Sequence, residues 1–271
     1  MALPAPAPDR TCLVTGASSG IGVEIARELA RRGHGITLVA RREGPLRELA
    51  DELADRHGVR TEVVTADLAA DAPGAGLAAA VAERDLVVDV LVNNAGFSTM
   101  GPVHRSEAAD EVRMVRTDVE AVVDLTSTFL PGMVERGRGA VLNVASTAAF
   151  QPLPGQAAYA ASKAFVLSYG QAVRAELRGS GVSLTTLCPG PVETGFASTM
   201  GIGDEEAAKA MPSFLWVSAE SVAAQAVAAL DGGAPVVIPG TGNKVAAAAA
   251  YLTPRRLLMP ILARQHPALH D

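Results

Sequence analysis

Cysteine is nearly absent from this sequence of 271 residues, which contains only Cys12 and Cys188. Both lie inside apolar, strand-like runs, and no CxxC pair or cluster of cysteine and histidine accompanies them. A disulfide framework or a zinc site needs more such residues at characteristic spacings. The sequence therefore predicts two buried structural thiols in a reducing compartment and no metal site.

Long hydrophobic runs are missing as well. The most apolar late segment, residues 245–263, is interrupted by Pro254, Arg255, Arg256 and Pro260, so it cannot cross a bilayer as one helix. The first ten residues have neither the basic region nor the apolar region of a signal peptide. We expect a cytoplasmic protein without an integral membrane segment.

The chain also lacks an excess of positive charge. The chain has 23 Lys and Arg against 29 Asp and Glu, a formal net charge of −6, and its basic residues are scattered. Binding to a phosphate backbone needs a concentrated basic face, so we expect no nucleic-acid partner. Aromatic residues make up only 4% of the chain, whereas hydrophobic residues make up 49%, which suits a close-packed core of helices on a sheet.

What the sequence does contain is an alternation of short apolar runs with longer segments of helical periodicity. Ile21, Ile25 and Leu29, for example, follow one another at a spacing of four. Near-continuous apolar strands that alternate with helices predict a parallel sheet covered on both faces, hence a single-domain, doubly wound α/β fold. The seven expected strands are residues 11–15, 35–40, 61–66, 88–93, 140–146, 182–189 and 235–239.

A glycine-rich loop, TGASSGIG at residues 15–22, directly follows the first expected strand and leads into a helix from about Ile21 to Arg32. A turn on glycines lets backbone N–H groups and the positive helix end approach a pyrophosphate. The glycine spacing differs from GxGxxG, and a plain tight turn is the alternative. The residues of this loop that we expect to bind a cofactor are Gly16, Ser18, Ser19, Gly20, Ile21 and Gly22.

Arg41 and Arg42 end the second expected strand, about twenty residues beyond the loop. Enzymes that use NAD place an acid here for the ribose hydroxyls. An acid would repel a 2′-phosphate, whereas a guanidinium can bind it with paired hydrogen bonds, so the sequence predicts NADP. The alternative is that both arginines are solvated residues at the start of the next helix.

Four motifs make the chain resemble the short-chain dehydrogenase/reductase family, in its NADP-preferring branch, from about Thr11 to Gly240. They are TGASSGIG at 15–22, NNAG at 93–96, Ser146 thirteen positions before YAASK at 159–163, and PGPVET at 189–194. The resemblance implies a Rossmann-type sheet in the order 3-2-1-4-5-6-7 and hydride transfer between a nicotinamide and a carbonyl or alcohol. It also implies a homodimer or homotetramer.

The same resemblance implies further cofactor contacts. Asp67 would contact the adenine, although an ordinary cap at a strand end is the alternative for this residue. Tyr159 and Lys163 would lie beside the nicotinamide ribose. The remaining implied positions are Asn93, Ala95 and Gly96, which would flank the adenosine ribose and steady the central strand, and Pro189, Gly190, Val192 and Thr194, which would hold the nicotinamide carboxamide.

Tyr159 and Lys163 are one helical turn apart on the same face, which a chance surface pair could also explain. Reduction of a ketone by hydride leaves an alkoxide that must be protonated, and the reverse reaction needs a base. A phenol has a pKa of about 10, and a cation about 4 Å away lowers it by at most about three units. We therefore expect Lys163 to lower the pKa of Tyr159, and Ser146 to donate a hydrogen bond to the substrate oxygen.

Asp118 departs from the family pattern, which has an Asn thirteen positions before the Pro of an LPxM stretch; here the stretch is LPGM, with Pro131. The main-chain role of that Asn, which is to hold a water that links the Lys to solvent, survives any side chain. A carboxylate cannot donate a hydrogen bond unless it is protonated. Asp118 is neutral, is charged and paired with Lys163 through water, or marks a shifted helix register. We expect a working relay with altered pH dependence.

Three parts of the chain are expected around this fold. Residues 1–10 read as a disordered tail, residues 11–240 as the dinucleotide-binding catalytic domain, and residues 241–271 as a C-terminal extension that covers a subunit interface or touches a membrane surface. Within the domain, residues 195–216 read as a mobile lid, followed by a helix that begins near Ser218.

Two classes of function remain open from the sequence. The first is an NADP(H)-dependent oxidoreductase that acts on a carbonyl or alcohol, with an apolar substrate such as a steroid-like or acyl-chain ketone. The stretches LVARRE and LPGM resemble the family branch that contains such reductases. The second is a non-catalytic NADP(H)-binding sensor or partner protein. Apolar residues of the lid that favour an apolar pocket, or else pack in the core, are Phe196, Met200, Met211, Phe214, Leu215 and Trp216.

Overall fold

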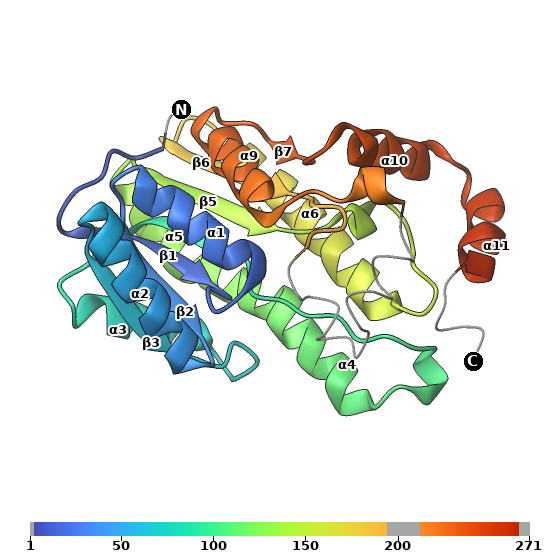
Figure 1. Cartoon of the computed structure of the whole chain (residues 1–271), viewed down its shortest axis with the longest axis horizontal. Helices are drawn as coiled ribbons and strands as arrows, with labels where there is room; N and C mark the ends of the chain where they lie inside the picture. Colours follow the sequence, from blue (N-terminus) through green and yellow to red (C-terminus); the bar gives the residue numbers. More distant parts are fainter. Residues whose placement is uncertain (1–2, 194–211, 266–271) are drawn as a thin grey trace.

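The computed structural model of the chain describes residues 3–193 and 212–265. A sheet of seven parallel strands forms its centre, in the order β3-β2-β1-β4-β5-β6-β7 (Figure 1). This order confirms the predicted doubly wound α/β fold. The strands are β1 (Arg10–Thr15), β2 (Gly35–Ala40), β3 (Thr61–Thr65), β4 (Val87–Asn93), β5 (Gly139–Val144), β6 (Val182–Leu187) and β7 (Val236–Val237).

The strands lie where the apolar runs predict them, except that β7 has two residues in place of the expected five. β5 and β6 are buried at every residue, because helices cover both faces of a parallel sheet. β1 pairs with both β2 and β4, so the strand order reverses between β1 and β4. A crevice for a ligand is expected at the carboxyl ends of the strands at such a reversal.

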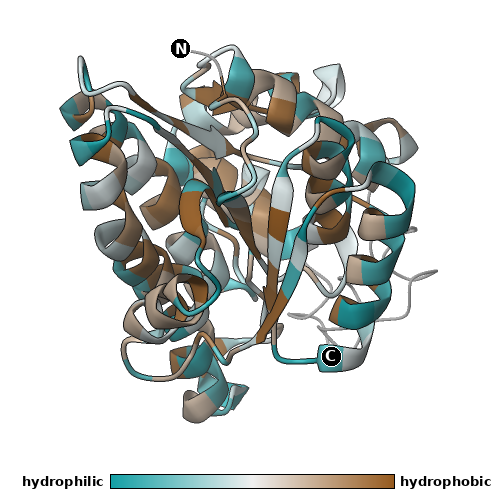
Figure 2. Ribbon diagram, turned by 90° about the vertical axis from the view of Figure 1, so that its left-hand side faces the viewer, coloured by the Kyte–Doolittle hydropathy of each residue, from teal (hydrophilic) through white to brown (hydrophobic). Residues whose placement is uncertain are grey.

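Two layers of helices cover the sheet, with α1, α2 and α9 on one face and α3, α5 and α6 on the other. Ile25 of α1 and Val222 of α9 belong to one apolar core, and Leu125 of α5 and Val173 of α6 to the second. Figure 2 shows hydrophobic residues gathered along the strands between the layers. These helices are α1 (Gly20–Arg31), α2 (Glu43–His57), α3 (Pro73–Ala82), α5 (Ala121–Glu135), α6 (Ala157–Glu176) and α9 (Ala219–Asp231).

Shorter helical elements connect the main strands and helices. A π-helical turn, η2, joins α4 to α5, so that these three elements form one helical segment. The shorter elements are η1 (Val103–Arg105), α4 (Ala108–Val115), η2 (Arg116–Glu120), η3 (Thr147–Phe150) and η4 (Ser213–Leu215). The start of α9 confirms the predicted cap, because the Oγ of Ser218 accepts a hydrogen bond from the N–H of Ser221 at 3.3 Å.

The N-terminal segment differs from the disordered tail that the sequence predicts for residues 1–10. The N–H of Leu3 donates to Asp231 at 2.9 Å, and its side chain packs against the first core. Pro4 is buried, and Arg138 donates to the carbonyl of Ala5. Apolar contacts and a distant hydrogen-bond partner hold the segment in place, which composition alone does not reveal.

The C-terminal segment forms two helices, α10 (Thr241–Leu252) and α11 (Arg255–Gln265), beyond β7 (Figure 1). Within residues 3–193 and 212–265, none of the helices combines the length and hydropathy that a membrane span needs. Most of the expected lid, with Phe196, Met200 and Met211, lies outside the described residues.

The two cysteines are free and buried, as predicted. Burial raises the pKa of both thiols, that of Cys188 to about 12, so both are neutral at physiological pH.

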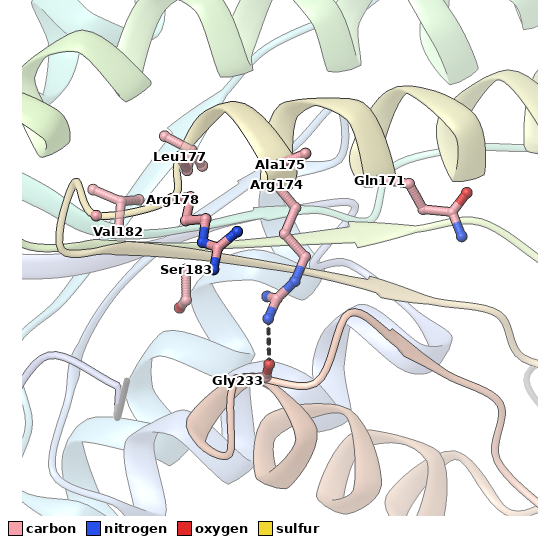
Figure 3. A pocket seen from close by; sticks show the side chains of 9 residues that line it. Gln171, Arg174, Ala175, Leu177, Arg178, Val182, Ser183 and Gly233 are labelled. Atoms are coloured by element: carbon pink, nitrogen blue, oxygen red, sulfur yellow. Dashed lines mark hydrogen bonds between the residues drawn. The ribbon is translucent and has the colours of Figure 1, made fainter.

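A cavity of about 490 Å³ lies where α6 ends and β6 begins, at the amino end of the sheet (Figure 3). Arg174 crosses it and donates to the carbonyl oxygens of Leu184 at 2.8 Å and Gly233 at 2.6 Å. The guanidinium therefore links α6 to β6 and to the turn after α9. The cavity is at the opposite end of the strands from the residues that the sequence singles out for catalysis.

Candidate active site

The glycine loop turns sharply between β1 and α1. Gly16 and Gly20 have φ angles of +66° and +61°, a region that L-residues rarely adopt. At Gly22 an added Cβ would lie 2.5 Å from both the side-chain nitrogen of Asn94 and the carbonyl oxygen of Gly16. The backbone path of this loop therefore requires glycine at these positions.

The N-terminus of α1 fits a phosphate group. Its N-cap, Ser19, makes no side-chain cap hydrogen bond, and the first turn contains no acidic residue. By contrast, α9 has both a serine cap and Glu220 in its first turn. The first N–H groups of a helix need an acceptor, and this end offers its donors and positive dipole to an anion at the carboxyl edge of the sheet.

Arg42 lies beside this loop. Its Nη2 is 3.4 Å from the carbonyl oxygen of Ser18 and 3.3 Å from the Ser18 hydroxyl, and the side chain is exposed. Arg41 is exposed next to it. A phosphate on the ribose that follows the pyrophosphate would meet these guanidinium groups, so the two arginines fit the 2′-phosphate of NADP.

The sequence analysis missed two residues that shape the loop, Thr15 and Asn94. The Thr15 hydroxyl donates to the carbonyl of Val92 and accepts from the N–H groups of Asn94 and Ala95 at 3.0 and 3.1 Å. The Asn94 side chain donates to the carbonyl oxygens of Thr15 and Gly16. These bonds tie the ends of β1 and β4 together. The position of Asn94 inside the NNAG motif could have indicated its role from the sequence.

Asn93 has a structural position at the centre of the sheet. Its side-chain nitrogen donates to Asn143 at 2.9 Å and to Thr126 at 3.1 Å, and all three residues are buried. This agrees with the part of the expectation that has Asn93 steady the central strand. Gly96, farther along the same segment, leaves the space into which the side chains of Asp118 and Lys163 fit, because an added Cβ would lie 3.0 Å from each.

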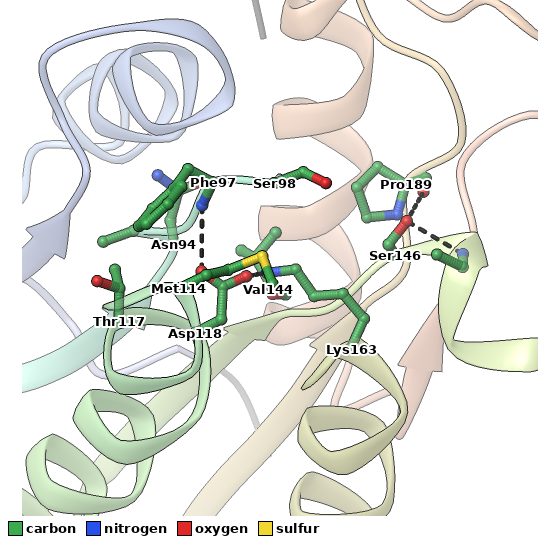
Figure 4. Close-up of polar contacts among 12 residues, drawn as sticks. Asn94, Phe97, Ser98, Met114, Thr117, Asp118, Val144, Ser146, Lys163 and Pro189 are labelled. Carbon is green, nitrogen blue, oxygen red and sulfur yellow. Dashed lines mark hydrogen bonds and ion pairs between the residues drawn. The ribbon is translucent and has the colours of Figure 1, made fainter. Parts of the chain in front are cut away.

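Ser146 follows β5 and starts the turn η3. Its Oγ accepts from the N–H of Ala148 at 3.1 Å and lies 3.5 Å from the carbonyl oxygen of Pro189 (Figure 4). The same hydroxyl is close enough to Tyr159 to lower the pKa of that phenol. Two elements that are separate in the chain, η3 and α6, thus bring the predicted serine and tyrosine together.

Lys163 is buried, with 5% of its surface exposed, and its Nζ lies 5.6 Å from the ring centroid of Tyr159. The same atom lies 3.4 Å from the carbonyl oxygen of Val144. Helical spacing on α6 places the two side chains on one face, and the carboxyl end of β5 closes the site from the other side. The structure therefore confirms that Ser146, Tyr159 and Lys163 are neighbours.

Asp118 completes the group from a third element, the π-helical turn η2. Its Oδ2 lies 2.9 Å from the Nζ of Lys163, and its Oδ1 accepts from the N–H of Phe97 at 3.1 Å (Figure 4). The side chain is fully buried. Burial raises the pKa of Asp118, whereas the Lys163 ammonium and the Phe97 N–H lower it. We assign the pair as carboxylate and ammonium, because the ammonium lies at ion-pair distance from one oxygen and a backbone donor faces the other. The contact is direct, so the structure excludes both the water-bridged pair and the shifted register.

The electrostatics of the tyrosine differ from the prediction. Burial raises the pKa of Tyr159, and together with the Asp118 carboxylate it outweighs the Lys163 ammonium and the Ser146 hydroxyl, which lower that pKa. Burial alone would lower the pKa of Lys163, but Asp118 and the Tyr159 phenol together outweigh it and raise that pKa. Lys163 thus lowers the phenol pKa as expected, but burial and the Asp118 carboxylate, which the sequence did not reveal, make the net shift upward.

Asp67 lies at the edge of the crevice. Its Oδ1 accepts from the N–H of Ala69 at 3.1 Å, which closes a turn, and its Oδ2 lies 3.1 Å from a nitrogen of Arg113. Its side chain is 47% exposed. The strand-end cap that the sequence left open is therefore present, alongside an ion pair to α4 that the sequence did not predict.

The segment after β6 forms the other wall. Pro189 accepts from the N–H of Thr147 at 2.8 Å, and Val192 bridges to Val217. Gly190 lies against Asn243, whose side-chain nitrogen donates to the carbonyls of Leu215 and Pro239, both at 2.9 Å. Asn243 is buried and was missed in the sequence. Thr194 lies outside the described residues.

Comparison with known proteins identifies the family. The sequence pattern of the short chain dehydrogenase family matches residues 10–204, which is most of the chain. This protein belongs to the short-chain dehydrogenase family. As a member of that family it is an oxidoreductase, and the glycine loop and the Ser146, Tyr159 and Lys163 group are the family motifs in their three-dimensional setting.

Individual relatives agree with this assignment. An NADP-dependent 3-hydroxy acid dehydrogenase of Salmonella typhi is 38% identical over 203 residues, 72% of this chain and 78% of the relative. A putative ketoacyl reductase of Streptomyces coelicolor is 41% identical over 192 residues, 69% of this chain and 72% of the relative. The structure of a short-chain dehydrogenase from Sphingobium yanoikuyae in complex with NADPH has a TM-score of 0.79 and 32% identity, covering 93% of this chain and 95% of that one.

Proposed function

We propose that this protein is an NADP(H)-dependent oxidoreductase that interconverts a ketone and a secondary alcohol. The observation that carries the proposal is the group at the carboxyl edge of the sheet. There the Ser146 hydroxyl lowers the pKa of Tyr159, and the buried Nζ of Lys163 lies 5.6 Å from the tyrosine ring. A phenol, a hydroxyl and an ammonium at one point provide the acid and the donors that carbonyl reduction needs.

The cofactor is NADP, which supplies or accepts the hydride when it is bound. The backbone donors at the start of α1 would hold its pyrophosphate, and Arg41 and Arg42 its 2′-phosphate. Relatives support this choice, since one is an NADP-dependent dehydrogenase and another was solved with NADPH. The residues that would contact the cofactor between these points and Ser146 are Ala95, Gly96, Pro189, Gly190 and Val192.

Tyr159 transfers the proton. Its raised pKa keeps the phenol protonated at neutral pH, and the protonated form is the one that donates to a developing alkoxide. The protonated phenol is the form that reduction of the ketone needs. Ser146 donates a second hydrogen bond to the same substrate oxygen and holds it near the phenol.

Lys163 and Asp118 set the electrostatics around the phenol. The Lys163 ammonium stabilises negative charge on the phenol oxygen as the proton leaves. Asp118 keeps Lys163 protonated and fixes its position by a direct contact of 2.9 Å. Because Asp118 is itself negative, it opposes part of the effect of Lys163 on Tyr159.

The substrate in this proposal is an apolar ketone, such as an acyl-chain or steroid-like ketone. Phe214 is 71% exposed and lies against Gly242 beside the start of α10, and Leu215 and Trp216 follow it. These side chains form an apolar rim next to the wall made by Val192 and Val217. The similarity to a putative ketoacyl reductase supports an acyl-chain substrate.

The test is oxidation of NADPH with a panel of ketones of increasing apolar size, compared with Tyr159→Phe. We expect turnover that rises with the apolar area of the ketone and that falls by about 10²–10⁴-fold in the variant. Tyr251→Phe is the matched control, because that phenol is 70% exposed and lies outside the site. Equal turnover in Tyr159→Phe and the wild type would contradict the proposal.

A second candidate function is a sensor that binds NADP(H) without turnover, favoured by the Asp118–Lys163 pair because it offsets the charge that would activate the phenol. Titration of the protein with NADPH distinguishes the two. Binding without turnover on any ketone of the panel would support the sensor. Turnover that depends on Tyr159 would exclude it.

A further inference from the structure

The C-terminal helices present large apolar side chains to solvent at one end of the molecule. The exposed fractions are 65% for Val245, 70% for Tyr251, 77% for Leu252, 58% for Leu257 and 51% for Ile261. We call these five residues the C-terminal patch. Single exposed apolar residues are common on protein surfaces, but a group on two successive helices marks an interaction surface.

α11 divides into two sides. Leu258 and Leu262, four residues apart, are half-buried. Leu257 and Ile261, also four residues apart, are exposed, and Arg256 is exposed beside them. The helix thus has one apolar side that is half-buried and a second one that is exposed, flanked by a basic residue. A helix of this kind suits the boundary between lipid headgroups and acyl chains.

The charge of this segment is opposite to that of the chain as a whole. Four of the 23 Lys and Arg lie between residues 241 and 265, namely Lys244, Arg255, Arg256 and Arg264, and none of the 29 Asp and Glu does. The chain has a formal net charge of −6. An apolar strip with cations and no anions complements an anionic lipid surface. Against a second copy of itself the same strip would bring like charges together, which disfavours that pairing.

The patch also lies near the candidate active site. α10 starts four residues after β7 ends, and Arg255 donates to the carbonyl oxygen of Phe150 at 3.1 Å. Phe150 is the last residue of η3, the turn that begins after Ser146. In Figure 1, α10 and α11 lie beyond the end of the sheet to which the strands point. A binding partner that contacts the C-terminal patch therefore also lies opposite the carboxyl edge of the sheet.

We propose that the C-terminal patch docks this protein reversibly on an anionic lipid bilayer, with α11 at the level of the headgroups. Docking itself does not depend on catalysis. If the proposed function holds, docking orients the active-site edge toward the phase in which apolar ketones dissolve.

The test is sedimentation of the full chain with sucrose-loaded vesicles of phosphatidylcholine, with and without about one third phosphatidylglycerol. We expect binding to the anionic vesicles at least about tenfold tighter than to phosphatidylcholine alone, and weaker binding as salt shortens the screening length. Failure of the wild type to sediment with anionic vesicles at low salt would overturn the proposal, whatever its activity with NADPH.

Two variants locate the binding surface. Leu257→Ser with Ile261→Ser removes the displayed apolar side of α11, and we expect at least about a tenfold loss of vesicle binding. Arg256→Gln removes one cation, and we expect about a fivefold loss that appears only on anionic vesicles. The control is Val103→Ser with Val112→Ser, which changes residues that are 62% and 54% exposed outside the patch.

Ketone reduction in solution and thermal unfolding are expected to stay unchanged in all of these variants, which shows that they are folded. Equal vesicle losses in the control and in Leu257→Ser with Ile261→Ser would overturn the assignment. A third outcome would also overturn it: the wild type forms a concentration-dependent dimer and does not bind vesicles, and Leu257→Ser with Ile261→Ser abolishes the dimer. The C-terminal patch would then bind a second copy of the chain.

Discussion

The Oδ2 of Asp118 lies 2.9 Å from the Nζ of Lys163, with both side chains buried. The pair joins η2 to α6 directly behind Tyr159. Lys163 therefore interacts with two negative or potentially negative groups, the carboxylate and the phenol. The family pattern has an Asn at the position of Asp118. The carboxylate beside Lys163 therefore distinguishes this chain, and with it the strength with which Lys163 acts on Tyr159.

Asp118→Asn is expected to change the pH dependence of the reaction. Asp118 raises the pKa of Tyr159, so its removal lowers that pKa. Reduction needs the protonated phenol, so kcat/KM for reduction should decline from a lower pH than in the wild type. Oxidation needs the phenolate, so it should extend to lower pH. The measurement is kcat/KM against pH in both directions.

Asp110→Asn is the control for that experiment, because Asp110 is exposed on α4 of the same helical segment. Its profile should match the wild type. Superimposable profiles for Asp118→Asn and the wild type would show that the carboxylate does not act on Tyr159.

Asp118→Ala is expected to destabilise the fold. Removal of one partner leaves the Lys163 ammonium buried without its counter-charge, which costs on the order of 3 kcal/mol in the free energy of unfolding. Urea denaturation measures the change. Adding Lys163→Met to Asp118→Ala should recover part of the loss, since no uncompensated charge then remains. A double variant less stable than Asp118→Ala would speak against this account.

Gly22→Ala is expected to damage the cofactor loop. Its Cβ would meet the Asn94 side chain and the Gly16 carbonyl at 2.5 Å, and such overpacking costs about 1–3 kcal/mol. We expect a lower free energy of unfolding and weaker NADPH binding, read by urea denaturation and by titration.

Gly44→Ala is the matched control for Gly22→Ala. Gly44 lies in α2 with no atom within 4 Å of an added Cβ, and its φ is not positive. Alanine there should stabilise the protein by about 0.5–1 kcal/mol. Similar losses of stability in both variants would show that the effect of Gly22→Ala does not come from the contacts with Asn94 and Gly16.

Arg42→Ala is expected to reduce the preference for NADPH over NADH. The guanidinium lies beside Ser18 at the loop that would hold the pyrophosphate, and a hydrogen bond to a charged group contributes about 1.5–3 kcal/mol. The Kd for NADPH should rise about tenfold or more, while that for NADH stays nearly constant. Arg47→Ala, an exposed residue paired with Glu43, serves as the control. A parallel rise for both cofactors would show that Arg42 does not read the 2′-phosphate.

Most of the fold follows from local patterns. Apolar runs bounded by glycines and polar residues predict strands, and residues such as Ile25 and Leu29 predict the buried side of α1, because these signals need only neighbouring residues. The cap at Ser218 is local in the same sense. The short β7 was not predictable in length, because pairing with β6 alone decides how many residues join the sheet.

The chemical residues were also visible in the sequence, because Ser146, Tyr159 and Lys163 belong to short motifs at specific spacings. Their electrostatics were not. The pKa of Tyr159 depends on burial and on a carboxylate 41 positions away in the chain. The support given by Asn94 and Asn243 likewise joins segments that are distant in sequence.

The sequence by itself thus determined the architecture, the cofactor loop and the side chains that we propose to react, since periodicity and motif spacing are local. Only the tertiary structure decided that Asp118 touches Lys163 and that Leu3 packs on the core. It also decided which apolar residues of the C-terminal helices face solvent. Distances between segments far apart in the chain, and the burial that they produce, arise only when the layers pack together.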